Sequence, residues 1–211
     1  MPAAAKTEPR WTRRKHARPE EITAAALEVF VERGYAGSRL EDVATRAGVS
    51  KGTLYLYFAN KEELFKAVVR EGLVSPIAEM RGIVDQFEGS TMELVRMMLF
   101  GWWERIGASR IGGIPKLVIS EAGNFPELAR FYLAEVVEPA QAATIAIVKR
   151  GIARGEFREV NADVVARLMA APMLGLLMWR NALEPFSNAK VDPVAYLEAH
   201  LDMLRHGLAR D

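Results

Sequence analysis

The chain has 211 residues, of which half are hydrophobic and about a quarter are charged, and its formal net charge is +1. It contains no cysteine, which excludes disulfide bonds and thiolate-ligated metal sites. The N-terminal residues lack the apolar core of a signal peptide, and the longest nearly apolar run, residues 168–179, is too short to cross a bilayer. We therefore expect a soluble, cytoplasmic protein that does not enter a membrane.

The charged residues are distributed unevenly along the chain. Residues 1–61 contain eleven Lys or Arg and seven Asp or Glu, a net charge of +4, whereas residues 62–211 have a net charge of −3. The basic excess is concentrated between Arg10 and Arg18. We interpret residues 1–18 as a basic, disordered arm that contacts phosphates or a minor groove, and a solvated tail without a partner is the alternative.

The first predicted helix runs from about Pro19 to Arg33. Proline suits the first turn of a helix, and the two glutamates that follow it favour the positive end of the helix dipole. Apolar residues recur at helical spacing and predict one buried face, formed by Ile22, Ala25, Ala26, Val29 and Phe30. Gly34 is predicted to end this helix.

Residues 38–61 predict two short helices joined by a tight turn, which is the helix-turn-helix pattern. Ser38 and Glu41 match a capping box at the start of the first helix. Gly48 stands where a helix ends in a left-handed residue, and Ser50 can cap the second helix. In such motifs the second helix lies in the major groove of DNA, although a helical hairpin can also bind nothing.

The outward face of the second helix favours a nucleic-acid partner. It carries hydroxyl groups and a lysine but no carboxylate, whereas a merely solvated helix face normally includes Asp or Glu. Hydroxyl and ammonium groups hydrogen-bond to phosphates and base edges. The predicted DNA-binding residues are Ser38, Arg39, Ser50, Lys51, Gly52, Thr53, Tyr55, Tyr57 and Lys61.

Residues 34–64 resemble the DNA-binding domain of the TetR family of transcriptional regulators. The resemblance is carried, in order and without gaps, by Gly34-Tyr35, Ser38, Asp42-Val43-Ala44, Ala47 to Tyr55, Tyr57-Phe58 and Lys61 to Leu64. It departs at Leu56, where many members have a more polar or aromatic residue. The resemblance implies a DNA-binding domain at residues 19–65 and an effector-binding and dimerisation domain at residues 66–211. It also implies a homodimeric repressor that binds a near-palindromic, double-stranded operator and is released by a small effector.

The remaining sequence predicts helices and no strand. One long helix is expected from Lys61 to Phe87 with a bend at Ser75-Pro76, and a second from about residue 124 to Gly155 with a kink at Pro139. Further helix starts are indicated by the capping residues Ser90, Asn161 or Asp163, and Asp192. The expected fold is all-α with about nine helices.

The last predicted helix has a heptad pattern. Its apolar residues follow steps of three and four, which is typical of a seam that packs on another helix; they are Val194, Leu197, Leu201, Leu204 and Leu208. The seam could pack within the chain. Because the preceding helix, residues 164–179, is apolar nearly all round, we assign the seam to a dimer interface instead, with two helices from each subunit forming a four-helix bundle.

Aromatic and methionine residues of the second domain form a candidate effector pocket. Each of them could equally fill a solid core, but methionine gives soft walls that suit varied ligands, and a buried Trp or Tyr needs a polar partner. The candidates are Met98, Leu99, Trp102, Trp103, Phe131, Tyr132, Met169, Met173 and Trp179. Since no second cluster of cations is evident, we predict a small, mainly apolar or aromatic effector with one polar end.

Motifs of common enzymes are missing from the sequence. There is no P-loop, no dinucleotide-binding glycine pattern after a strand and no nucleophile elbow, and the three histidines form no metal-binding pair. We expect no catalysis, no cofactor and no metal. The competing function is a helical protein that binds small molecules or a protein partner without binding specific DNA.

Overall fold

The structure is a computed structural model and describes residues 19–210; the predicted basic arm, residues 1–18, lies outside the described residues. Over the described range the chain is helical, with one isolated bridge between Phe157 and Ala209. The α-helices are α1 (Pro19–Gly37), α2 (Leu40–Arg46), α3 (Lys51–Tyr57), α4 (Lys61–Val69), α5 (Ser75–Gln86), α6 (Thr91–Trp102), α7 (Gly113–Glu121), α8 (Pro126–Tyr132), α9 (Glu138–Ala153), α10 (Ala162–Met178) and α11 (Pro193–Leu208). The prediction of an all-α fold is confirmed.

Short π-helical turns join several of these segments into longer helices. They are η1 (Arg70–Val74) between α4 and α5, η2 (Trp103–Gly107) after α6, η4 (Leu133–Val137) between α8 and α9, and η5 (Trp179–Leu183) after α10. Two 3-10 turns, η3 (Arg110–Gly112) and η6 (Glu184–Phe186), precede α7 and follow η5. Counted as continuous helices, residues 19–210 contain nine, as predicted.

Three of the π-helical turns are followed, after one intervening residue, by a proline. Pro76 follows η1, Pro139 follows η4, and Pro185 follows η5. A proline donates no backbone hydrogen bond and its ring clashes with the carbonyl four residues earlier, so the wider turn before it accommodates the ring. A π-helical turn therefore stands just before Pro76 and Pro139, where the sequence predicted a bend and a kink.

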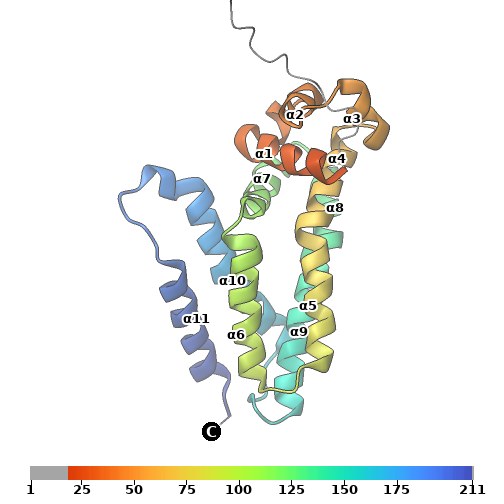
Figure 1. Cartoon of the computed structure of the whole chain (residues 1–211). Helices are drawn as coiled ribbons and strands as arrows, with labels where there is room; N and C mark the ends of the chain where they lie inside the picture. The colour runs from red at the N-terminus through yellow and green to blue at the C-terminus, as the bar shows by residue number, and fades with distance from the viewer. Residues whose placement is uncertain (1–18, 211) are drawn as a thin grey trace, which may run out of the picture.

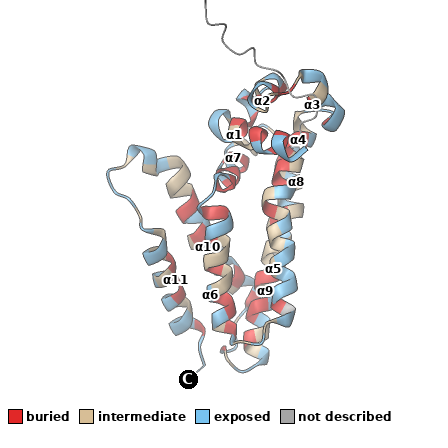
Figure 2. Ribbon diagram, viewed as in Figure 1, coloured by how far each residue is buried: buried red, intermediate tan, exposed pale blue. Residues whose placement is uncertain are grey.

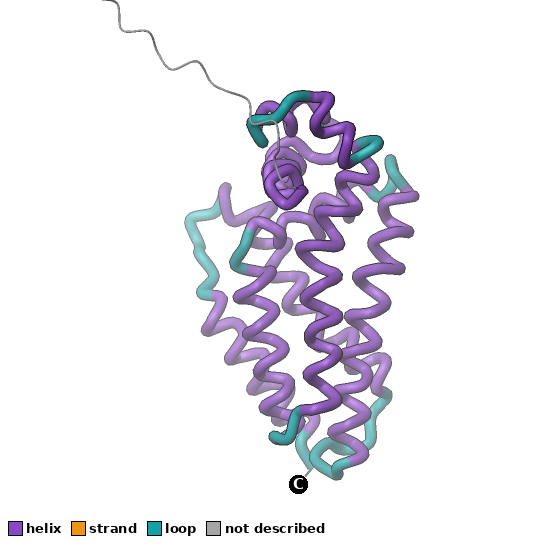
Figure 3. Tube along the Cα trace, turned by 45° about the vertical axis from the view of Figure 1, so that its right-hand side comes forward, coloured by secondary structure: helices purple, strands orange, loops and turns teal. Residues whose placement is uncertain are grey.

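The helices form a compact head on an elongated body (Figure 1). The head consists of α1 to α4, and α5, α6, α9 and α10 run lengthwise through the body, with α11 beside them (Figures 1 and 3). Buried residues line the inner faces of these helices, while their outer faces are exposed (Figure 2). One core cluster joins the head to α7, α8 and η4, so packing is continuous across the predicted domain boundary at residue 65.

Most predicted helix caps are present, but the one at Ser38 is wrong. Side-chain N-caps occur at Ser50, Asn60, Ser90, Asn161 and Asp192. Arg39, not Ser38, precedes α2, and no side chain caps that helix. Ser38 is buried, and its Oγ donates to the carbonyls of Gly34 at 2.5 Å and Val29 at 3.3 Å. The left-handed Gly34, at φ +73°, turns the chain back so that Ser38 faces α1.

The leucine seam of α11 packs inside its own chain. Leu197, Leu201 and Leu208 are buried in the core of the body, and Leu204 is half-buried against the same core. Only Val194 of the predicted seam is exposed. The intrachain alternative therefore holds for four of the five residues, which corrects the assignment of this seam to a dimer interface.

Two continuous helical runs have the length and apolar composition of a membrane span, namely Pro126–Ala153 and Ala162–Phe186. They are longer than the apolar run at residues 168–179, because the helices continue through Pro139 and Pro172. Core helices of soluble proteins have the same composition, and in this structure both runs pack against α6 or each other. By themselves they are weak evidence for a membrane.

Candidate nucleic-acid interface and ligand cavity

The helix-turn-helix is held by a small set of local contacts. Gly48 adopts the predicted left-handed conformation at φ +69°, and the next residue, Val49, is buried between α2 and α3. The Ser50 hydroxyl accepts a hydrogen bond from the Thr53 backbone N–H at 3.0 Å. Leu54 is fully buried, which fixes α3 against the head and determines which of its faces points outward.

The outward face of α3 is exposed and carries no acidic residue. Tyr55 and Tyr57 are each about half exposed, and Leu56 between them is 83% exposed. Lys51 forms an ion pair with Glu41 of α2 and lies 5.7 Å from the centre of the Tyr55 ring. This ion pair lowers the pKa of the Glu41 carboxyl below its usual value.

Two of the predicted DNA-binding residues point inward. The Lys61 ammonium donates to the backbone carbonyls of Tyr35 at 2.7 Å and Ser38 at 3.2 Å, and it lies over the Tyr35 ring. Burial lowers the pKa of Lys61. Lys61 therefore joins α4 to the turn between α1 and α2, and like Ser38 it is occupied within the head. Arg39, by contrast, is exposed.

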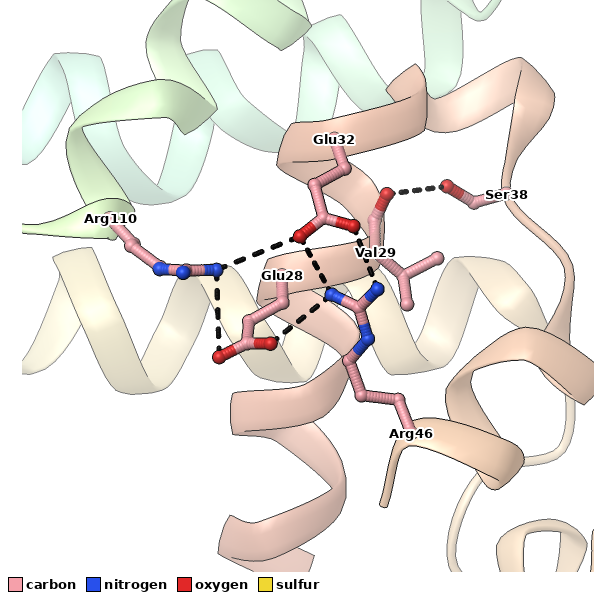
Figure 4. A network of polar contacts seen from close by, with 6 residues as sticks. All are labelled: Glu28, Val29, Glu32, Ser38, Arg46 and Arg110. Carbon is pink, nitrogen blue, oxygen red and sulfur yellow. Dashed lines mark hydrogen bonds and ion pairs between the residues drawn. The ribbon is translucent and has the colours of Figure 1, made fainter. Parts of the chain in front are cut away.

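A network of ion pairs links α2, α1 and the body (Figure 4). Arg46 of α2 pairs with both oxygens of Glu32 at 2.8 Å and with Glu28 at 3.2 Å. The Arg110 guanidinium, in η3, lies 3.5 Å from the Glu28 carboxylate and 3.8 Å from the Glu32 carboxylate. The hydrogen bond from Arg46 lowers the pKa of Glu32. Because all four side chains are substantially exposed, the network orients α1, α2 and η3 relative to one another more than it stabilises the fold.

Helix α7 connects the head to the body by closer packing. A Cβ added at Gly113 would lie 3.0 Å from the methyl groups of Val31, so any larger residue there would require Val31 to shift by a few tenths of an ångström. At the far end of α7, Glu121 accepts a hydrogen bond from the backbone N–H of Ala36 at 3.1 Å. Beyond it, Phe125 packs edge-on against Tyr35 with ring centroids 4.8 Å apart.

The body contains a cavity of about 430 Å³ between α5, α6, η4, α9 and α10. Its walls are mainly apolar, and the N-terminal part of α7 reaches it through Pro115. The polar lining residues are Arg105, Tyr132, Gln141, Thr144 and Arg167. This volume lies in the range of small-molecule sites, which are about 300–1,000 Å³.

Some of the polar groups in the cavity already have partners. Arg105 pairs with Glu79 at 2.8 Å. With the amide group of Gln141 turned so that its oxygen faces Arg167, this oxygen accepts a hydrogen bond from the Arg167 guanidinium at 3.0 Å. Burial raises the pKa of Tyr132, and its hydroxyl makes no hydrogen bond to the groups that the structure describes. Tyr132 and Arg167 therefore offer donors to a molecule in the cavity.

Four of the nine predicted pocket residues line this cavity, namely Met98, Trp102, Tyr132 and Met173. Leu99 and Met169 are buried in the solid core, and Phe131 lies under the Arg70 guanidinium. Trp103 and Trp179 line a separate, smaller hollow. These five are corrections to the predicted pocket.

The wall formed by α5 and its preceding turn was not predicted from the sequence. Leu73, Pro76, Ile77 and Met80 all line the cavity. Their spacing of three, four and seven residues is that of one helix face, so the signal was present in the sequence. It indicated a buried stripe, but nothing in it distinguished a cavity wall from core packing.

Family models match both parts of the chain. Residues 22–68 match the model described as bacterial regulatory proteins of the tetR family, and residues 88–206, more than half of the chain, match the tetracyclin repressor-like C-terminal domain. The chain belongs to the TetR family. The resemblance noted in residues 34–64 is thereby confirmed and extends over the body, which had shown no comparable motif.

Individual TetR-family relatives match over different lengths. The transcriptional regulator RutR of Escherichia coli is 37% identical over 98 residues, so the chain spans about half the length of this relative, and the match covers 46% of either chain. The fatty acid metabolism regulator protein of Bacillus subtilis is 27% identical over 196 residues, covering 92% of this chain and 98% of the relative.

A solved TetR-family structure has the same fold. The regulator FadR from Bacillus subtilis, in complex with stearoyl-CoA, superimposes with a TM-score of 0.77 at 23% identity, covering 90% of this chain and 99% of that one. At this identity the match supports the fold and says nothing by itself about the ligand of this chain.

Proposed function

We propose that the protein is a transcriptional regulator, acting as a repressor in the cytoplasm, that places α3 in the major groove of a near-palindromic operator. The observation that carries this proposal is the outward face of α3. Seven consecutive residues, Lys51–Tyr57, contain no carboxylate, and those that point away from the core are exposed. Base-edge contacts come from Lys51, Gly52, Thr53, Tyr55 and Tyr57, with Arg39 and Ser50 near phosphates.

A twofold dimer is part of this proposal, through a different face from the leucine seam. On α10, Val164, Leu168, Ala171 and Gly175 are exposed at steps of four, three and four residues. On α11, Met203 is 73% exposed on the side away from the core. An apolar stripe of this length on neighbouring helices favours pairing with the same helices of a second copy.

The proposed effector is a small, mainly apolar molecule with one polar or acidic end. The apolar walls take its hydrophobic part, and Arg167 and the Tyr132 hydroxyl take the polar end. The stearoyl-CoA in the FadR structure from Bacillus subtilis, which carries a long acyl chain, supports this class of ligand without identifying it. A solid hydrocarbon core would need no such donors.

The effector is proposed to act through α5 and α7. The cavity wall Leu73 to Met80 belongs to the same continuous helix as α4 of the head. Pro115 in the cavity wall belongs to α7, which also packs against α1 of the head. A ligand that displaces these two helices changes the spacing of the two recognition helices, which must match the helical repeat of DNA, about 34–36 Å.

In vitro selection from random duplexes tests the DNA part, followed by binding measurements at several salt concentrations. We expect one enriched, near-palindromic sequence and an affinity that falls steeply with salt. Failure to enrich any sequence, together with ligand binding that quenches Trp102, would favour the competing function of a small-molecule-binding protein without specific DNA binding.

A further inference from the structure

Leu56 is placed at the centre of the outward face of α3. Two residues of an α-helix correspond to a rotation of about 200°, so Leu56 points directly away from Leu54, which is fully buried. Its side chain is 83% exposed, far more than the tyrosines on either side of it. Leu56 makes no contribution to the core of the head.

The polar groups near Leu56 are already oriented by neighbours. The Thr53 hydroxyl lies 2.8 Å from the Ser50 hydroxyl, and the Lys51 ammonium is paired with Glu41. One turn before Leu56, a Cβ added at Gly52 would meet nothing closer than the Ser50 hydroxyl at 3.7 Å. The centre of the face is therefore an open glycine beside a projecting apolar side chain.

We infer that Leu56 is a specificity-determining residue that contacts the C5 methyl group of a thymine in each half-site. This inference rests on the proposed function. Among the base edges in the major groove, the thymine methyl is the apolar group, and all other features are hydrogen-bond donors or acceptors. A leucine forms no hydrogen bond, so the selectivity it can give comes from burying this methyl. The open surface at Gly52 lets the helix approach the groove closely enough for that contact.

Replacing thymine by uracil tests the contact, because uracil lacks only the methyl group. The operator is first obtained by selection with the wild-type protein. Each thymine is then replaced by uracil in both half-sites, and affinity is measured for the wild type, Leu56→Ala and the matched control Leu133→Ala. Leu133 is an exposed leucine of η4, remote from α3 and outside the cavity lining. Thermal unfolding checks that both variants are folded.

We expect one thymine position at which uracil weakens wild-type binding by about fourfold per half-site, the value of one buried methylene-sized group. Leu56→Ala should bind the thymine operator more weakly and lose this discrimination, while Leu133→Ala should keep both. Equal wild-type affinity for all thymine and uracil operators would overturn the inference, as would discrimination that survives in Leu56→Ala. Failure to select any operator would overturn the proposed function as well, so the two failures are distinguishable.

Discussion

Substituting Leu168 by Glu tests where the second copy docks. Leu168 lies on α10 with 61% of its surface exposed, so the substitution leaves the monomer core intact. Fully burying a leucine is worth about 1.5–3 kcal/mol, and burying the exposed part about 1–2 kcal/mol. A twofold interface contains the residue twice, so Leu168→Glu should weaken dimerisation by about 2–4 kcal/mol, or roughly 30- to 700-fold, before any charge desolvation.

Sedimentation velocity over a concentration series measures this effect, with thermal unfolding as the check on the monomer. Leu133→Glu is the matched control, because this leucine has a similar exposure of 50% but lies on η4. Leu201→Ala provides the opposite case, since Leu201 is 2% exposed in the core. It should destabilise the fold by about 2–5 kcal/mol. A Leu168→Glu variant that dimerises like the wild type would refute the proposed face.

Three further substitutions test other parts of the structure. Gly101 lines the cavity, and an added Cβ there would meet nothing within 4 Å. Gly101→Leu should therefore fill the cavity, raise the melting temperature and abolish the quenching of Trp102 fluorescence by hydrophobic ligands. Unchanged ligand binding would place the effector elsewhere. Ser38→Ala removes a buried hydroxyl that donates to two carbonyls and should cost about 1–2 kcal/mol in chemical denaturation, whereas no loss would contradict the inward position of Ser38. The hydrogen bond from Arg70 lowers the pKa of Glu135, so this pair stabilises the fold above pH 4.5 and loses its effect as the pH falls through the lowered value. On acidification, Glu135→Gln should therefore lose less free energy of unfolding than the wild type. The difference should be under about 1 kcal/mol because both side chains are partly exposed. Identical dependence of the unfolding free energy on pH in the two proteins would exclude the contribution of this pair.

Local signals in the sequence were sufficient for the head and for most helix ends. Gly48 and Ser50 each determine a backbone geometry within a few residues, and both adopt the predicted roles. The predicted cap at Ser38 is wrong because the turn at Gly34 brings the Ser38 hydroxyl against the Val29 carbonyl of α1, and a capping pattern carries no information about that contact nine residues earlier in the sequence. The inward position of Lys61 could not be predicted for the same reason, since its hydrogen-bond acceptors are 23 and 26 residues away in the sequence.

Periodicity predicted which residues are buried but not what covers them. The leucine seam of α11 is buried as its spacing indicates, yet against α6 and α10 of the same chain instead of a second copy. Likewise, aromatic and methionine residues cannot be divided between a cavity and a core from sequence alone. Trp102 lines the cavity while the adjacent Trp103 does not, because successive helix residues point about 100° apart.

The most direct test of the proposed function compares the wild type with the triple variant Lys51→Ala/Tyr55→Ala/Tyr57→Ala on the selected operator. All three side chains are exposed on α3, so the variant should fold like the wild type. At about 1–3 kcal/mol for each base-edge contact, binding to the operator should fall to the level of unrelated DNA. A folded triple variant that binds the operator with unchanged affinity would contradict the placement of α3 in the major groove.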